Sequence, residues 1–206
     1  MSVRSNDSQL ASSASVPAVV DLLIQRLGSK VSPLLIEAFF ICAGLWTLVL
    51  AGQFRFHLPW TPVPVTAQTL VVLLIGATYN LRMSMITLSA YLVGGGLGLP
   101  FFAAGAAGWA VFAGPTGGYL LGFFASAFVL SFLRSRGWDQ KFKTSWPLFY
   151  LGHTCIFVFG VSWLSIHVGW AKAFQLGFVP FLPGEVIKTS LAAGLLPWLR
   201  RNLSHF

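Results

Sequence analysis

The sequence predicts an all-α integral membrane protein that has six transmembrane helices and both termini in the cytoplasm. The chain of 206 residues is 56% hydrophobic and only 9% charged, whereas soluble domains carry about 25% charged residues. Its basic residues also divide unevenly between the loops that successive apolar segments would place on opposite sides of a membrane. A chain of this length is expected to form one domain.

Residues 1–32 are the longest polar stretch, and we expect them to form a cytoplasmic segment. Positions 1–15 are rich in serine, which is typical of disorder, and they lack the basic and apolar regions of a cleaved signal peptide. Positions 16–27 are predicted to form a short amphipathic helix at the membrane surface.

The first three apolar segments are 34–52, 66–78 and 84–100. The first has 19 residues, which at about 1.5 Å per residue give a helix of roughly 28 Å, enough to cross the hydrocarbon core. Segment 66–78 is short, so part of the proline- and aromatic-rich loop 53–65 is expected at interfacial depth. We predict an uncharged loop rich in small residues at 101–114.

The remaining segments are 115–133, 147–167 and 183–199, each of which begins with a proline, a favourable first residue of a helix. Residues 134–146 form a polar loop, and 168–182 form an aromatic loop with glycine and proline. The six segments give a membrane domain over 33–201, followed by a tail at 202–206.

The basic residues fix the predicted orientation, because cytoplasmic loops of membrane proteins are enriched in lysine and arginine. Ten lie on the side of the termini: Arg4, Arg26, Lys30, Arg82, Arg134, Arg136, Lys141, Lys143, Arg200 and Arg201. Only Arg55 and Lys172 lie on the other side, and Lys188 lies inside the last segment. We therefore expect a multi-pass protein of the plasma (inner) membrane whose loops 53–65, 101–114 and 168–182 face outward.

An ion pair inside the last segment is the main functional signal. Glu185 and Lys188 are three residues apart, which puts both side chains on one face of a helix. Charges within membrane segments are costly and therefore suggest a functional site. An inert internal salt bridge is the alternative.

The outer ends of the even-numbered segments gather further polar groups, from 62–70, 114–123 and 178–188. Helix N-termini there would suit an anionic group. Thr66, Gln68, Thr116 and Tyr119 add donors and acceptors. Candidate apolar walls are Trp60, Phe101, Phe102, Trp109 and Phe112. This combination is typical of a small-molecule site.

Several of these residues also have simpler interpretations. Gly117 and Gly118 could serve only tight helix packing, the polar residues at 66 and 68 could be helix caps, and the aromatics could be an interfacial belt. Glu37 stands alone and could reach the cytoplasmic edge. His57, His153 and His167 lack the spacing of metal ligands, so we expect surface or packing roles. Cys42 and Cys155 form no redox or zinc motif.

In order along the chain, the motifs PVPVTAQTL (62–70), GLGLPFF (96–102), GPTGGYLLGF (114–123) and PFLPGEVIK (180–188) resemble those of the BioY family. These proteins are the biotin-binding S components of energy-coupling factor (ECF) transporters. The resemblance covers about 34–199. Family members commonly carry aspartate where this chain has Glu185, so the negative charge is kept with a reach one methylene longer.

The resemblance implies uptake of biotin, which would be captured from the outer side and delivered inward with an ECF transmembrane coupling protein and two ATPase subunits. The expected biotin-binding residues are Glu185, Lys188, Thr116, Gly117, Gly118, Tyr119, Thr66, Gln68 and Tyr91. Pro59, Trp60 and Pro62 would form a lid. The family's small-x-x-x-small coupling face has its nearest match at Ala38 and Cys42.

We expect no enzymatic activity, no cofactor, no metal and no nucleic-acid partner. The sequence lacks a Walker A motif for ATP hydrolysis. Two alternatives remain. One is a binding subunit for another small vitamin. The other is an intramembrane enzyme, which would need a nucleophile–base pair or a metal cluster at membrane depth.

Overall fold

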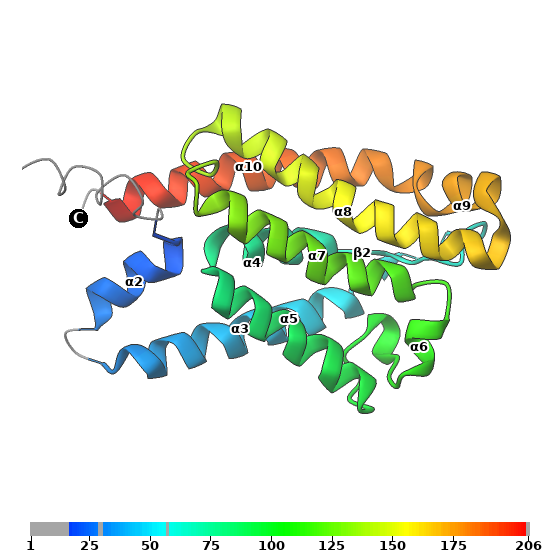
Figure 1. Cartoon of the computed structure of the whole chain (residues 1–206), viewed down its shortest axis with the longest axis horizontal. Helices are drawn as coiled ribbons and strands as arrows, with labels where there is room; N and C mark the ends of the chain where they lie inside the picture. The colour runs from blue at the N-terminus through cyan, green and yellow to red at the C-terminus, as the bar shows by residue number, and fades with distance from the viewer. Residues whose placement is uncertain (1–16, 29–30, 57, 205–206) are drawn as a thin grey trace, which may run out of the picture.

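The computed structural model describes residues 17–28, 31–56 and 58–204, which fold into a bundle of roughly aligned helices (Figure 1). The elements in chain order are α2 (Val19–Leu27), α3 (Pro33–Gln53), β1 (Arg55–Phe56), β2 (Val65–Thr66), α4 (Gln68–Thr78), α5 (Leu81–Gly96), η2 (Ala103–Gly105), α6 (Ala110–Ala113), α7 (Gly117–Arg134), α8 (Phe142–Val168), α9 (Trp170–Gly177), η3 (Val179–Phe181) and α10 (Leu182–Ser204). The expected disorder of 1–15 concerns residues outside those described.

Each of the six predicted segments overlaps one helix of the bundle: α3, α4, α5, α7, α8 and α10. Helix α8 begins at Phe142, inside the predicted polar loop 134–146, and α5 ends at Gly96, before the predicted end at 100. Four stretches of the described chain are long and apolar enough to cross a membrane, namely Pro33–Gln53, Gly117–Arg134, Lys143–Val168 and Trp170–Asn202. Helix α4 is apolar but has only 11 residues, and α5 has 16. The chain is therefore a mostly helical, multi-pass membrane protein.

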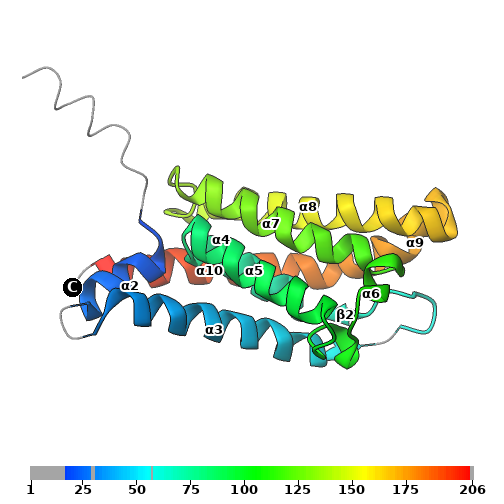
Figure 2. The same ribbon diagram turned by 60° about the horizontal axis from the view of Figure 1, so that its bottom comes forward.

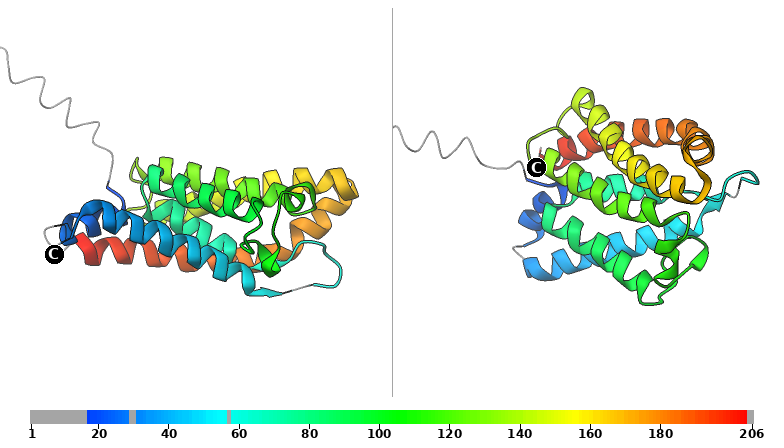
Figure 3. Two further views of the ribbon diagram at one scale, coloured as in Figure 1. Left: turned by 90° about the horizontal axis from the view of Figure 1, so that it is seen from below. Right: turned by 45° about the vertical axis from the view of Figure 1, so that its right-hand side comes forward.

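The two ends of the bundle differ (Figures 2 and 3). One end, which we call the cavity end, carries the paired strands β1 and β2 with their connecting loop, α6 and α9. The other, which we call the basic end, carries α2, the α7–α8 loop and the C-terminal part of α10. At the basic end lie the described arginines and lysines that the sequence analysis assigns to the cytoplasm: Arg82, Arg134, Arg136, Lys141, Lys143, Arg200 and Arg201.

Helix α5 begins three residues earlier than predicted, because Asn80 caps it. The Asn80 Oδ1 accepts a hydrogen bond from the backbone N–H of Met83 at 2.9 Å, which satisfies one of the free donors of the first turn. The Asn80 amide also donates to the Asp21 carboxylate at 2.8 Å. This contact ties the α4–α5 turn to α2, the helix predicted at 16–27.

Two predicted loops contain helices that the sequence analysis missed. Loop 168–182 holds α9 and η3, and loop 101–114 holds η2 and α6. Gly169 has a φ of 81°, a conformation that favours glycine, and it lets the chain turn sharply from α8 into α9. The small residues Ala173 and Gly177 are the buried ones of α9. Their spacing of four puts them on one helical face.

The last helix also extends further than predicted, into the expected tail at 202–206. Helix α10 continues to Ser204, so 202–204 are helical. Arg200 holds this end through a buried ion pair with Asp139 from the α7–α8 loop, and it donates to the backbone carbonyl of Pro17 at 2.7 Å. Burial raises the pKa of the Asp139 carboxyl, and the Arg200 guanidinium opposes that rise. One arginine thus joins three parts of the basic end.

Glycines allow α7 and α8 to approach closely. A Cβ on Gly118 would lie 2.2 Å from the Cβ of Trp163, and one on Gly122 would lie 2.8 Å from the Cα of Ile156. Both distances are too short for real side chains, so these positions require glycine. Close packing of this kind through small residues is common between membrane helices.

Candidate functional site

The Glu185 carboxylate is the centre of a buried polar cluster between α4, α8 and α10. Its Oε1 accepts from Lys188 Nζ at 2.8 Å. The Thr69 hydroxyl lies 3.1 Å from each carboxylate oxygen. The expected ion pair therefore exists, and Glu185 is only 6% exposed.

Lys188 is fully engaged within the protein. Besides Glu185, its ammonium donates to the backbone carbonyl of Thr66 and to the Thr69 hydroxyl, both at 2.9 Å. An ammonium has three N–H donors, and all three have protein acceptors here. Lys188 therefore fixes the start of α4 against α10.

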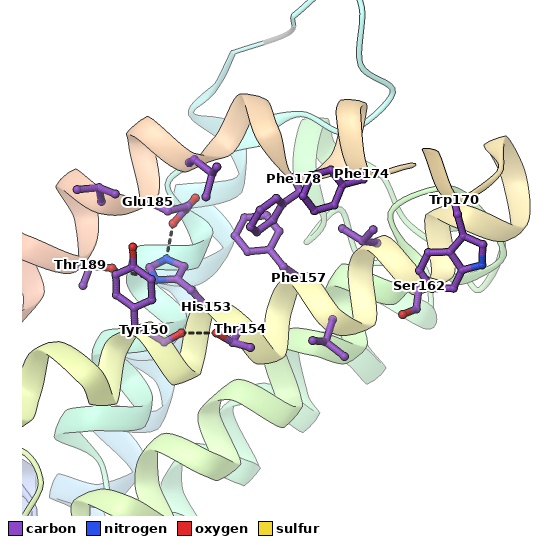
Figure 4. A pocket seen from close by; sticks show the side chains of 14 residues that line it. Tyr150, His153, Thr154, Phe157, Ser162, Trp170, Phe174, Phe178, Glu185 and Thr189 are labelled. Atoms are coloured by element: carbon purple, nitrogen blue, oxygen red, sulfur yellow. Dashed lines mark hydrogen bonds and ion pairs between the residues drawn. The ribbon is translucent and has the colours of Figure 1, made fainter. Parts of the chain in front are cut away.

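A third partner of Glu185 comes from α8. The His153 Nε2 contacts the Oε2 of Glu185, and its Nδ1 lies 3.0 Å from the Thr189 hydroxyl. Figure 4 shows His153 between these two α10 side chains. The imidazole is buried, so Glu185 is held by α4, by its own helix and by α8.

A cavity of about 230 Å³ opens beside this cluster at the cavity end. The lining residues come from the two β-strands and the loop between them, α4, the α5–α7 connection, α7, α8, η3 and α10. They are Arg55, Val63, Pro64, Thr66, Gln68, Thr69, Phe102, Ala103, Ala106, Val111, Thr116, Tyr119, Leu120, Phe123, Ile156, Phe157, Phe181 and Glu185. Phenylalanine rings and aliphatic groups form most of the wall, and its polar side chains are Arg55, Thr66, Gln68, Thr69, Thr116, Tyr119 and Glu185.

Five of the predicted ligand residues line this cavity: Thr66, Gln68, Thr116, Tyr119 and Glu185. Each of them lies at or near the start of an even-numbered predicted segment. These segments converge because α4, α7 and α10 enter the bundle from the same end (Figure 1).

Tyr91 lies behind the lining instead of in it. Its hydroxyl accepts from the Gln68 side-chain amide at 2.5 Å, and its ring stacks on Phe101 with centroids 6.4 Å apart. Gly117 and Gly118 are likewise buried at helix contacts and absent from the lining. For both glycines the packing interpretation fits the geometry.

The loop between β1 and β2 reaches beyond the bundle at the cavity end (Figure 3). Pro59, Trp60 and Pro62, the expected lid residues, are exposed and do not line the cavity. Their neighbour Thr61 is buried, and its hydroxyl donates to the backbone carbonyl of Leu176 in α9 at 2.6 Å. The loop is thus fastened to α9.

Ala38 and Cys42, the expected partner-interface residues, are exposed on α3. They lie one helical turn apart on the same face. Large apolar side chains are exposed along this helix as well: Leu34, Leu35, Phe39, Trp46 and Leu50. This part of α3 is therefore largely exposed within the described chain, apart from the edge-on contact of Trp46 with Phe101.

Several site residues were missed. Thr69 lies in a quoted motif and one turn after Thr66, so helical spacing could have found it. Of the five aromatic residues expected to form the walls, only Phe102 lines the cavity. Phe123, Phe157 and Phe181 line it as well, although they were not predicted to do so. For His153 a surface or packing role was expected, but its buried ring also contacts the Glu185 carboxylate. No signal in the sequence pairs these two residues, which lie 32 positions apart.

These features define the class of the protein: a membrane-embedded helical protein with a small, mainly apolar cavity and a buried charged cluster at one side. Among the described residues no group of histidine, cysteine, aspartate and glutamate could hold a metal ion. Such a cavity is suited to binding a small molecule that has both apolar surface and hydrogen-bonding groups.

The chain belongs to the BioY family, whose model matches residues 27–205. It is 40% identical over 168 residues to the biotin transporter BioY2 of Lactococcus lactis, covering 79% of this chain and 90% of the relative. It is 35% identical over 156 residues to the biotin transporter BioY of Thermotoga maritima, covering 74% and 90%.

The fold also matches a solved structure. The crystal structure of the S-component for biotin from an ECF-type ABC transporter superposes with a TM-score of 0.73, covering 80% of this chain and 90% of that one. The sequence identity in this superposition is 22%, so this likeness concerns the fold.

Proposed function

We propose that this protein is the biotin-binding S component of an ECF transporter and that it binds biotin in the cavity beside Glu185. Membership of the BioY family supports the ligand. The observation that carries the proposal is the buried Glu185 cluster at the wall of a small cavity. At about 230 Å³ the cavity is smaller than the roughly 300–1,000 Å³ of sites for drug-sized ligands, which favours a small solute.

The chemistry of the cluster favours a ureido group beside Glu185. A carboxylate offers about four lone-pair positions, and Thr69, Lys188 and His153 use about three of them. The remaining position can accept an N–H of the biotin ureido ring. A charge-assisted bond of this kind is strong in a site that excludes water.

The biotin carboxylate requires a cation that is free to donate. The three donors of Lys188 already have acceptors in the protein, whereas Arg55 lines the cavity and is exposed. Biotin would therefore bind with its ureido ring at Glu185 and its tail toward Arg55. In this arrangement Lys188 acts by holding Glu185 and the start of α4.

In the proposed topology α3, α4, α5, α7, α8 and α10 all cross the plasma membrane, with both termini in the cytoplasm. The basic end would be cytoplasmic because its arginines and lysines obey the positive-inside rule. The cavity would then open outward, and the loop around Trp60 would cover bound biotin.

Uptake would need an ECF transmembrane coupling protein and two ATPase subunits. The exposed face of α3 around Ala38 and Cys42 is the proposed docking surface, since small residues allow a second helix to approach closely. Ala38→Trp should abolish energised uptake and leave biotin binding intact, whereas Ile166→Trp on the exposed face of α8 should affect neither. Loss of binding in Ala38→Trp would mean that α3 serves folding instead.

Direct titration tests the proposal. Purified protein without ATP or partner subunits should bind biotin by isothermal titration calorimetry, and it should not bind riboflavin or thiamine under the same conditions. Binding of one of those vitamins alone would favour the alternative S component. Turnover of a substrate without partners would favour the intramembrane enzyme.

A further inference from the structure

The contact between His153 and Glu185 has no role in the binding chemistry described so far. Helix α8 brings the imidazole against the Oε2 of Glu185 (Figure 4), whereas Lys188 contacts the Oε1. His153 is 5% exposed, and both of its ring nitrogens have partners on α10. A buried imidazole held at both nitrogens has a fixed orientation.

The partners define which nitrogen carries the proton. An ionised carboxylate can only accept hydrogen bonds, so the Nε2 that contacts Glu185 must donate. The Thr189 hydroxyl can donate to the Nδ1 at 3.0 Å. The described charged groups around the imidazole are Glu185 and Lys188, which already balance each other. A charged imidazole would leave a net positive charge buried, so the geometry favours the neutral Nε2–H form.

A second cavity lies beside His153 and Glu185. A groove of about 390 Å³ runs between α8, α9 and α10, and its lining includes His153, Phe157, Glu185 and Thr189. Glu185 and Phe157 line the smaller cavity as well. The carboxylate thus lies in the wall between the two spaces. His153 and Thr189 line the groove and not the smaller cavity, so the close contact of Nε2 holds the Oε2 at that boundary.

We infer that His153 is a positioning residue of the binding site: as the neutral Nε2–H tautomer, oriented by Thr189, it holds the Glu185 carboxylate as the acceptor for the ligand. This inference rests on the proposed function for the identity of the ligand. The arrangement itself belongs to the unliganded protein and can be measured without biotin.

Three substitutions separate positioning from packing. His153→Gln keeps a side-chain N–H at the reach of Nε2 and should bind biotin within about threefold of the native protein. His153→Leu keeps a similar volume, and His153→Asn cannot reach Glu185. Both lose a hydrogen bond to a charged group, so each should bind roughly 10- to 100-fold more weakly. Thr154→Val, the next residue on α8 and also in the groove, should bind like the native protein.

If His153 only fills space, Leu should be tolerated at least as well as Gln, and that order of affinities would overturn the inference. Equal affinity of all three His153 variants and the native protein would overturn it too. Calorimetric titration with biotin gives these affinities, and thermal unfolding of each variant confirms that it is folded.

Nitrogen-15 NMR of ligand-free protein labelled at histidine tests the tautomer, with the His153→Asn spectrum identifying the resonances. The Nε2 should have the shift of a protonated ring nitrogen and the Nδ1 that of an unprotonated one. A doubly protonated ring or the opposite tautomer would overturn the inference. Should the native protein fail to bind biotin, the proposed ligand would be wrong, and the NMR result would still decide whether His153 donates to Glu185.

Discussion

Each end of the bundle has a buried ion pair, and the two pairs have different surroundings. Asp139 and Arg200 at the basic end join the α7–α8 loop, α10 and the segment before α2, and the Asp139 side chain is fully buried. The Glu185 carboxylate lines a mainly apolar cavity, whereas Asp139 lies away from that cavity at the opposite end of the bundle. A buried pair away from the cavity stabilises the assembly of its elements, whereas one whose carboxylate lines the cavity can also contact a ligand.

Among these substitutions, Glu185→Gln should have the largest effect on biotin binding. A small effect would contradict the binding role assigned to the Glu185–Lys188 pair. The substitution removes the charge that the ligand would meet and leaves the partly buried ammonium of Lys188 without its counter-ion. We expect a loss of about 2–5 kcal/mol of binding free energy, which is roughly 30- to several-thousand-fold in affinity.

The matched control is Glu37→Gln, which neutralises the carboxylate of α3 at a position that does not line the cavity. Its biotin affinity, measured by the same titration, should be that of the native protein. A change of less than threefold in Glu185→Gln would mean that the pair beside the cavity is structural.

Arg200→Met should reduce stability and leave biotin affinity unchanged. The free energy of unfolding should fall by about 3 kcal/mol, the lower end of the range for breaking a buried pair, because Arg134 keeps another positive charge near Asp139. Arg82→Met, which removes an exposed arginine at the same end, is the control and should cost little. Denaturation in detergent measures both.

The destabilisation of Arg200→Met should depend on pH in one direction. Burial raises the pKa of Asp139 in the folded protein, and loss of Arg200 removes an opposing effect. A raised pKa penalises the folded state above that pKa, and the penalty disappears below the unfolded value of about 3.9. The deficit relative to native protein should therefore shrink as the pH falls, and a deficit that grows would contradict this account.

Glu185→Asp should sharpen the comparison, since it keeps the charge and shortens the reach by one methylene. Affinity should fall by about tenfold or less, which is at most about 1.4 kcal/mol, because the negative charge is retained. If this substitution weakens binding as much as Glu185→Gln does, distance matters as much as charge.

The smallest expected effect concerns the loop at the cavity end. Thr61→Val removes the hydrogen bond to Leu176, which is worth about 1 kcal/mol, so bound biotin should dissociate about five times faster. Thr61→Ser keeps the hydroxyl and should restore the native rate in stopped-flow measurements. Equal rates in all three proteins would mean that this contact does not retain the ligand.

The long elements could be predicted from the sequence because apolar runs and charged loops mark them directly. The middle of each predicted segment is helical in the structure, and the errors of prediction concern the helix ends and the connections between helices. Asn80 extended α5 through a cap, and α9 formed in a predicted loop where Ala173 and Gly177 pack against the bundle. Such features depend on neighbours in space, which hydropathy does not report.

The site could be predicted in part for the same reason. Glu185 and Lys188 stand out as charges in an apolar helix, and their pairing follows from helical spacing. His153 did not stand out, because its contact with Glu185 depends on how α8 packs against α10. The glycines at 117 and 118 resembled a ligand loop, although Gly118 lies too close to Trp163 for any larger residue.

Thermal unfolding with and without biotin tests the separate roles of the two ion pairs most directly. Native protein, Glu185→Gln and Arg200→Met would be compared under identical conditions, with biotin saturating for the native protein. Biotin should raise the midpoint of the native protein and of Arg200→Met by similar amounts, although the latter starts lower, and it should raise that of Glu185→Gln little or not at all. An equal rise in Glu185→Gln and native protein, or no rise in Arg200→Met, would contradict the account.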